Sequence, residues 1–265
     1  MFPHLVLFGK AISLYQIFAI LGYFVSGIYA CLVCRKNGRD DNNAIIFFLV
    51  IAVGVLLGAH LLYGILNFRL ILYVIENISK VNSLKLAFEI FIEIFGGSIF
   101  YGGLLGGLVA AAIYFRKNPE NKFLADIVAP SIPLFHFFGR IGCFLSGCCY
   151  GIESFFGFTS YHSPIESANG VSRFPVQLLE ALFNLGLFFI LDYLRKKDFF
   201  KNRLVFVYLA AYSVGRFLLE FLRGDSYRGF LLGLSTSQII SILIFFFVTG
   251  FIAITHLRKP GIVKT

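Results

Sequence analysis

Two arginines inside apolar segments are the side chains of this sequence best suited to chemistry. Arg140 belongs to Gly-Arg-Ile-Gly-Cys-Phe-Leu-Ser-Gly-Cys-Cys-Tyr-Gly, residues 139–151, and Arg216 lies in a later apolar run. A charge in an apolar segment is expensive, so each arginine needs a reason to be there. The planar fork of a guanidinium matches two oxygens of a phosphate. The pair therefore predicts a site for an anionic ligand.

Carboxylates offer a structural alternative for both arginines. Tyr212, Arg216 and Glu220 follow one another at intervals of four residues, so they share a helix face on which Glu220 can neutralise Arg216. Arg140 has no acidic neighbour in its own apolar run. A carboxylate from another run would have to steady it, and the candidates are Glu89, Glu93 and Glu180.

Three cysteines follow Arg140, namely Cys143, Cys148 and Cys149. They can be packing thiols, a disulfide from Cys143 to either of the others, metal ligands, or a nucleophile at Cys143. The C-x4-C-C pattern lacks the paired spacing of a zinc site, so we expect no metal here, and we expect no cofactor. His136 lies one turn before Arg140 and is a reserve candidate for proton transfer.

Membrane helices must position these groups. The chain is 58% hydrophobic and 14% charged, with a mean hydropathy of +0.83, which is too much apolar surface for one soluble core. The net charge of +9 comes from short clusters of Lys and Arg after apolar runs, without a basic face, and it does not indicate nucleic acid. The first apolar stretch lacks a small-x-small cleavage site, so we expect it to remain as a span.

Seven apolar runs are long enough to cross a bilayer, for which about 20 residues suffice. They are residues 11–34, 44–66, 88–115, 123–148, 175–194, 203–222 and 235–257. Pro130 and Pro133 interrupt the fourth run, and a broken membrane helix often lines a cavity.

Basic residues gather after the odd-numbered runs, which places the N-terminus outside and the C-terminus in the cytoplasm. The longest outer connections, near 67–87 and 149–174, would form a small extracytoplasmic cap. We find no internal repeat. The sequence thus predicts an all-α, polytopic membrane helix bundle made of one domain, residues 1–265.

Glycines replace larger side chains along the third run, in Phe-Gly-Gly-Ser-Ile-Phe-Tyr-Gly-Gly-Leu-Leu-Gly-Gly, residues 95–107. Small residues of this kind let two membrane helices approach closely. The missing side chains can equally make room for a lipid headgroup beside Tyr101. The motif by itself does not decide between packing and binding.

Five motifs, taken in order along the chain, resemble the prolipoprotein diacylglyceryl transferase family. They are Gly-Gly-Leu-Leu-Gly-Gly at 102–107, Gly-Arg-Ile-Gly at 139–142 with Gly151 closing the block, Arg-Phe-Pro-Val-Gln-Leu-Leu-Glu at 173–180, Tyr212 with Arg216 and Glu220, and Gly-Leu-Ser-Thr-Ser-Gln at 233–238. Each motif is weak alone, but their order and spacing are specific. The seven-span topology with an outer N-terminus is also that of the family.

The resemblance implies a multi-pass transferase of the bacterial cytoplasmic membrane. It would move the diacylglyceryl group of phosphatidylglycerol to the lipobox cysteine thiol of a prolipoprotein and release glycerol phosphate on the outer side. Arg140 and Arg216 would hold the phosphate as charge develops on it, and Tyr212 and Glu220 would orient the arginine. The other implied substrate-binding residues are Gly102, Gly103, Gly106, Gly107, Gly142, Gly151, Gln177 and Glu180.

The sequence departs from the family pattern at several positions. Tyr101 stands where family members usually have a histidine, and Cys143, Ser146 and Cys148 replace two asparagines and an acidic residue. Either Tyr101 or a displaced base such as His136 then moves the proton, or the acceptor is not a lipoprotein thiol. The alternatives are a sugar, a polymer or a small amphiphile as acceptor, or a membrane protein that binds lipid without catalysis.

Overall fold

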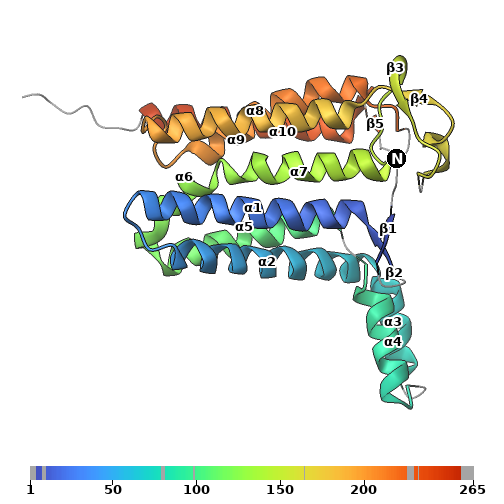
Figure 1. The fold of residues 1–265 in the computed structure, drawn as a ribbon. Coiled ribbons are helices and arrows are strands. Elements are labelled where there is room, and N and C mark those ends of the chain that lie inside the picture. The colour runs from blue at the N-terminus through green and yellow to red at the C-terminus, as the bar shows by residue number, and fades with distance from the viewer. Residues whose placement is uncertain are drawn as a thin grey trace, which may run out of the picture. The chain divides into compact units, whose positions relative to one another are not determined.

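The computed structural model describes residues 4–7, 10–78, 81–97, 99–163, 165–225, 230–231 and 233–257, and for residues 6, 7, 10, 100, 101, 231 and 255–257 it describes the backbone only. The elements run in the order β1 (His4–Leu7), β2 (Lys10–Ser13), α1 (Leu14–Lys36), α2 (Asn42–Leu66), α3 (Phe68–Glu76), α4 (Leu84–Phe95), α5 (Phe100–Lys117), η2 (Pro119–Phe123), α6 (Leu124–Val128), α7 (Ser131–Ser146), β3 (Glu153–Thr159), η3 (Glu166–Ala168), β4 (Ser172–Arg173), α8 (Val176–Lys196), α9 (Leu204–Leu219), η4 (Glu220–Leu222), β5 (Phe230–Leu231), β6 (Leu234–Ser235) and α10 (Thr236–Leu257) (Figure 1).

The chain folds as two compact units. The first is formed within Met1–Asn37 and Phe123–Thr265, and the second within Gly38–Lys122. In the first unit α7 packs between α1 and α8, and α9 packs against both α8 and α10 (Figure 1). In the second unit α2 packs along α5.

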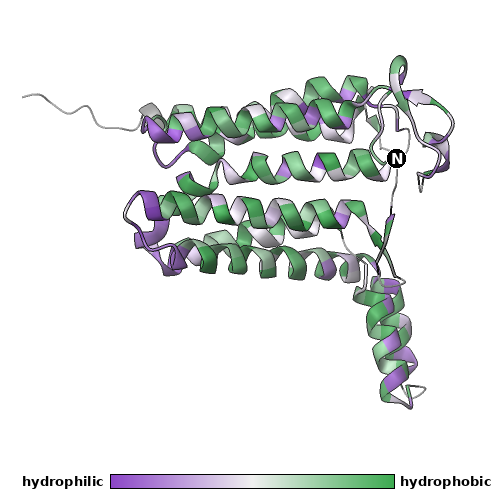
Figure 2. Ribbon diagram, in the orientation of Figure 1, coloured by the Kyte–Doolittle hydropathy of each residue, from purple (hydrophilic) through white to green (hydrophobic). Residues whose placement is uncertain are grey.

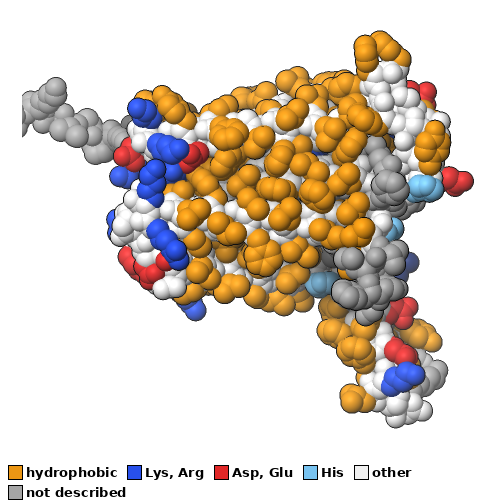
Figure 3. Space-filling view, in the orientation of Figure 1, with side chains coloured by type: hydrophobic (Ala, Val, Ile, Leu, Met, Phe, Trp, Pro, Cys, Tyr) orange, Lys and Arg blue, Asp and Glu red, His pale blue; other side chains and the backbone are white. Residues whose placement is uncertain are grey.

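The helices are apolar along most of their length, and polar residues concentrate in the connections (Figure 2). Large hydrophobic side chains such as Leu182 and Phe246 are exposed on them. Figure 3 shows hydrophobic side chains across the helical surface, with Lys and Arg gathered where α8 leads into α9. A surface of this kind belongs in lipid rather than in water.

Within the described residues, five helices are long and apolar enough to cross a membrane. They are Leu14–Lys36, Asn42–Leu66, Val176–Lys196, Leu204–Leu222 and Thr236–Ile254. A sixth span arises if the pair Pro119–Val128 and Ser131–Ser146, bent by 43°, counts as one. The protein is therefore a mainly helical, multi-pass membrane protein. The bend lies at Ala129 and Pro130, as the prolines of the fourth run predict.

The prediction of one continuous helix over residues 88–115 is wrong. The chain breaks between α4 and α5, at Gly96 and Gly97, where a helix loses stability for lack of side chains. His60 Nδ1 lies 2.8 Å from the carbonyl oxygens of both Phe95 and Gly97, so the side chain of another helix takes up backbone groups freed by the break.

The two connections expected to form an outer cap contain secondary structure. Residues 67–87 carry α3 and the beginning of α4. Residues 149–174 carry the antiparallel pair of β3 and β4, so the all-α description needs this small correction. Aromatic residues favour the strand conformation of β3, and its Phe155, Phe156 and Phe158 are all exposed.

Candidate functional site

Glu180 of α8 lies between the two arginines. Its Oε1 is 2.9 Å from Nη2 of Arg140 on α7, and its Oε2 is 3.6 Å from Nη1 of Arg216 on α9. The Glu180 side chain is only 2% exposed. The hydroxyl of Tyr212 also donates to Oε1, at 3.3 Å. One buried carboxylate therefore ties three helices together.

Arg216 has two carboxylate partners, whereas Arg140 has one, and the buried Nη1 of Arg216 makes no hydrogen bond within the described residues. Its Nη2 lies 2.8 Å from Oε2 of Glu220, which confirms the ion pair expected from their spacing, and it donates to Ser237 Oγ of α10 at 3.2 Å. Its side chain is 11% exposed, against 20% for Arg140. Arg140 thus keeps the more open position of the two, beside a single carboxylate.

His136 lies on the same side of α7 as Arg140 and packs within this group. Its Nδ1 is 2.7 Å from the hydroxyl of Tyr208, and its ring centre is 5.3 Å from that of Tyr212. The side-chain amide of Asn184 donates to the backbone carbonyl of Glu180 at 2.8 Å. The site is therefore a buried polar network built across α7, α8 and α9.

Three of the predicted binding residues shape the backbone around the network. A β-carbon on Gly142 would lie 3.1 Å from both Tyr15 Cα and Phe18 Cβ, so this glycine lets α1 approach α7. Gly151 pairs with Arg223 in an isolated β-bridge. Gln177 donates to the backbone carbonyl of Cys148 at 2.8 Å and fastens the chain after α7 to the start of α8.

The four glycines of the third run belong to the second unit and pack α5 on α2. A β-carbon on Gly102 would meet the carbonyl oxygen of Gly58, and one on Gly106 would meet that of Gly54. Those on Gly103 and Gly107 would come within 3.2 Å and 3.0 Å of the Val55 side chain. Close helix packing explains these glycines. The side chain of Tyr101 lies outside the described residues.

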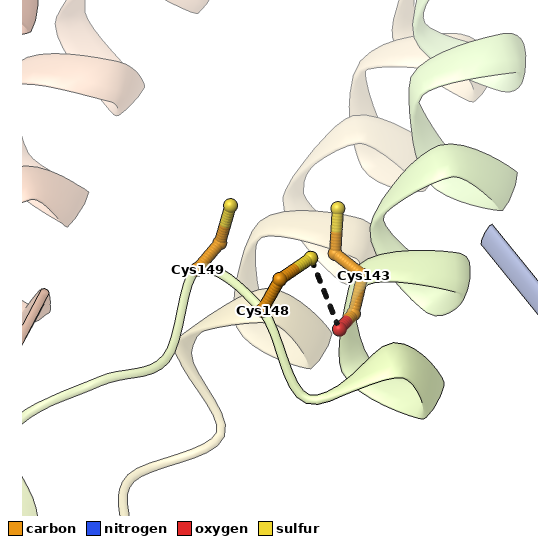
Figure 4. Close-up of side chains that lie close together, drawn as sticks. All are labelled: Cys143, Cys148 and Cys149. Atoms are coloured by element: carbon orange, nitrogen blue, oxygen red, sulfur yellow. Dashed lines mark hydrogen bonds between the residues drawn. The ribbon is translucent and has the colours of Figure 1, made fainter. Parts of the chain in front are cut away.

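The cysteines after Arg140 come together at the end of α7. The Sγ atoms of Cys143, Cys148 and Cys149 all lie within 4.8 Å of one another, and none of the five cysteines forms a disulfide. Cys148 Sγ donates to the carbonyl oxygen of Cys143 at 3.7 Å (Figure 4). Hydrogen bonds from the other two thiols lower the pKa of Cys149, and the charges of Arg140 and Arg223 lower it further.

Glu180 is the common partner of both arginines, which the sequence does not predict, and Asn184, Tyr208 and Ser237 are further members of the site that it does not predict. A signal for part of this set is present, because Gln177, Glu180 and Asn184 are polar residues in an apolar run. Their spacing places them on one helix face, and all three are buried. A buried polar face on an apolar helix is a mark of a functional site.

The sequence as a whole is similar to known proteins. A family model described as "Prolipoprotein diacylglyceryl transferase" matches residues 3–254. A "Phosphatidylglycerol--prolipoprotein diacylglyceryl transferase" of Clostridium tetani is 35% identical over 241 residues, which cover 89% of this chain and 90% of the relative. A relative of Clostridium perfringens, with the same name followed by the numeral 2, is 32% identical over 259 residues, or 96% and 93% of the two chains. One from Campylobacter hominis is 32% identical over 266 residues, or 96% and 89%.

Proposed function

The chain belongs to the prolipoprotein diacylglyceryl transferase family, and from that premise we propose that it moves the diacylglyceryl group of phosphatidylglycerol to the cysteine thiol of a prolipoprotein. The family match runs through both compact units. This extent supports residues 1–265 working as a single membrane-embedded transferase domain, with glycerol phosphate as the second product.

Seven crossings are the topology we propose. They are the five long helices, the bent pair that ends with α7, and α5. Basic residues close α1, α5 and α8, as Arg35 and Lys36, Arg116 and Lys117, and Arg195 and Lys196. Together they support a cytoplasmic location for these three ends. The N-terminus and the C-terminal ends of α7 and α9 then face outward, and the site opens on the outer side of the membrane.

The reaction exchanges one bond for another. The acceptor sulfur forms a bond to the terminal glyceryl carbon of the lipid as the bond from that carbon to the phosphate oxygen breaks. The electron pair of the broken bond stays on the phosphate oxygen, and the thiol proton goes to a base. Charge therefore grows on the phosphate during transfer, and a fixed cation beside it lowers the barrier.

Arg140 is the residue we assign to the phosphate. The observation that carries this assignment is its incomplete pairing, because one oxygen of Glu180 neutralises it while Arg216 also has Glu220. A guanidinium has five N–H donors, so Arg140 can keep Glu180 and still present a fork to phosphate. Arg216 supports this arrangement by holding the second oxygen of Glu180, and Tyr212 orients the first.

Proton transfer is assigned to Tyr101, with His136 in reserve. His136 contacts Tyr208 and lies in the same network as Arg140, which supports a role near the phosphate. Cys143 lines the site three residues beyond Arg140 and stays a candidate catalytic residue. A Cys143→Ser variant that makes product at an unchanged rate would exclude a covalent intermediate on this thiol.

A transfer assay with Arg140→Lys tests the assignment. The purified protein, in lipid containing labelled phosphatidylglycerol and a lipobox peptide, is scored for both glycerol phosphate and lipidated peptide. We expect Arg140→Lys to reduce transfer by about 10²-fold to 10³-fold, because lysine keeps the charge but loses the fork.

Arg195→Lys is the matched control, since Arg195 pairs with Asp192 at the other end of α8 and should tolerate the change. Glycerol phosphate without lipidated peptide would indicate a different acceptor. Neither product from the intact protein would indicate a lipid-binding protein. Equal activity of Arg140→Lys and the intact protein would contradict the role of Arg140.

A further inference from the structure

Three thiols gather at the C-terminal end of α7 and in the turn that follows it. In sequence they lack the paired spacing of a zinc site, but in space their Sγ atoms all lie within 4.8 Å of one another. Figure 4 shows Cys143 on the last turns of α7, and Cys148 and Cys149 on the segment that turns back beside it. We propose that these three cysteines bind one thiophilic cation with a filled d shell, zinc(II) or copper(I), as thiolates.

The spacing of the sulfur atoms is close to that of such a site. A zinc–sulfur bond of about 2.3 Å places the sulfurs of a tetrahedral site roughly 3.8 Å apart. Sulfurs within 4.8 Å of one another reach that spacing with shifts of about 1 Å. Small rotations of the side chains are enough. Soft thiolate ligands select copper(I) and zinc(II) over harder cations.

Backbone conformation places the third thiol. Gly147 ends α7 with φ of 71°, which turns the chain back on itself. Cys149 then adopts φ of 55°, a left-handed conformation that non-glycine residues seldom take. Glycine or asparagine would fit this position with less strain. The strained residue is the one that completes the cluster, and strain of this kind often marks a function.

Two arginines lie near the cluster. Both Arg140 and Arg223 act electrostatically on Cys149. Each arginine also has a carboxylate partner, Glu180 for Arg140 and Asp225 for Arg223. A cation bound by three thiolates forms a complex of net negative charge, and nearby guanidinium groups make such a complex less costly to bury than it would be in an apolar setting.

Metal content gives a direct test that needs no lipid substrate. The full chain is prepared with Cys31→Ser and Cys34→Ser, so that the cluster holds its only thiols. The reduced protein is equilibrated with zinc(II) or with copper(I), desalted, and analysed for metal by mass spectrometry. We expect about one ion per chain for at least one of the two metals, and the comparison identifies which. Cobalt(II) in place of zinc should give thiolate charge-transfer absorption.

Single substitutions in the cluster separate ligation from folding. Cys143→Ser and Cys148→Ser should each weaken binding by about 100-fold or more. Cys149→Asn removes the third thiol but suits the left-handed backbone, so this variant should fold normally and still lose the metal. Retention of metal by Cys149→Asn would overturn the proposal. Failure of the reduced parent to retain either ion would also overturn it, and neither result bears on the transferase function.

Discussion

Two regions of the molecule join their helices by opposite means. In the second unit α2 and α5 meet through glycines, and the backbone of one helix lies against the backbone of the other. In the first unit α7, α8 and α9 meet through Arg140, Glu180 and Arg216, which are long charged side chains. We call these contacts the glycine seam and the charged network. A glycine seam is expected where two membrane helices need only to pack closely against each other.

The two regions differ in the groups that they can offer to a ligand. Removing side chains brings backbones together but leaves few groups to contact a ligand. The charged network instead keeps buried N–H donors and carboxylates side by side. Such an arrangement is stable only when every charge has a partner. A phosphate can replace part of that partnership. For this reason we propose the charged network, and not the glycine seam, as the region that binds the anionic substrate.

Glu180→Gln should disrupt the charged network, and of the three substitutions it should lower stability and transfer the most. It leaves Arg140 and Arg216 without their shared carboxylate, and removing one partner of a buried ion pair costs about 3–5 kcal/mol. We expect a clearly lower thermal midpoint in detergent and loss of transfer. Glu89→Gln, at an exposed pair with Lys85, should leave the midpoint unchanged. Equal midpoints for both variants would show that the network does not stabilise the fold.

Gly106→Ala tests the seam with a smaller expected effect. Its β-carbon would meet the carbonyl oxygen of Gly54, so α2 and α5 must separate, at a cost of about 1–3 kcal/mol. Gly186→Ala is the matched control, since its β-carbon enters open space and alanine favours a helix. Thermal unfolding of the two variants should move in opposite directions. If Gly106→Ala unfolds like the intact protein, the glycines do not serve packing.

Tyr208→Phe tests one hydrogen bond of the charged network, and we expect it to have the smallest effect of the three substitutions. It removes the hydroxyl that lies 2.7 Å from His136 Nδ1, and the loss of one buried hydrogen bond costs about 1 kcal/mol. We expect a small drop in the thermal midpoint and less than about tenfold loss of transfer. Exposed Tyr193 provides the control substitution. A loss of transfer much larger than the loss of stability would instead assign His136 to proton transfer.

Most of the helices could be predicted from the sequence. The run 11–34 forms α1, Leu14–Lys36, and the run 175–194 forms α8, Val176–Lys196. An apolar run long enough to cross a bilayer has few stable structures other than a helix. The prediction of one helix over residues 88–115 was wrong because mean hydropathy does not detect a break within an apolar run. That break depends on His60, which reaches the freed carbonyl groups from another helix.

The site was predictable only where it is local. Arg216 and Glu220 are four residues apart on one turn of the chain, so spacing alone gives their ion pair. The pairing of Arg140 with Glu180 depends on how α7 packs on α8, which no local pattern encodes. The thiol cluster depends likewise on one left-handed turn at Gly147 and a second at Cys149.

The position of Glu180 on α8 has a consequence for biosynthesis. Arg140 leaves the ribosome first, and while α7 is alone in the translocation channel its guanidinium has no carboxylate to pair with. An unpaired arginine within a membrane helix raises the free energy of insertion, by up to about 2.5–3.5 kcal/mol when it lies at the helix centre. We expect α7 to wait for α8 and to enter the lipid with it as a preassembled hairpin, already neutralised.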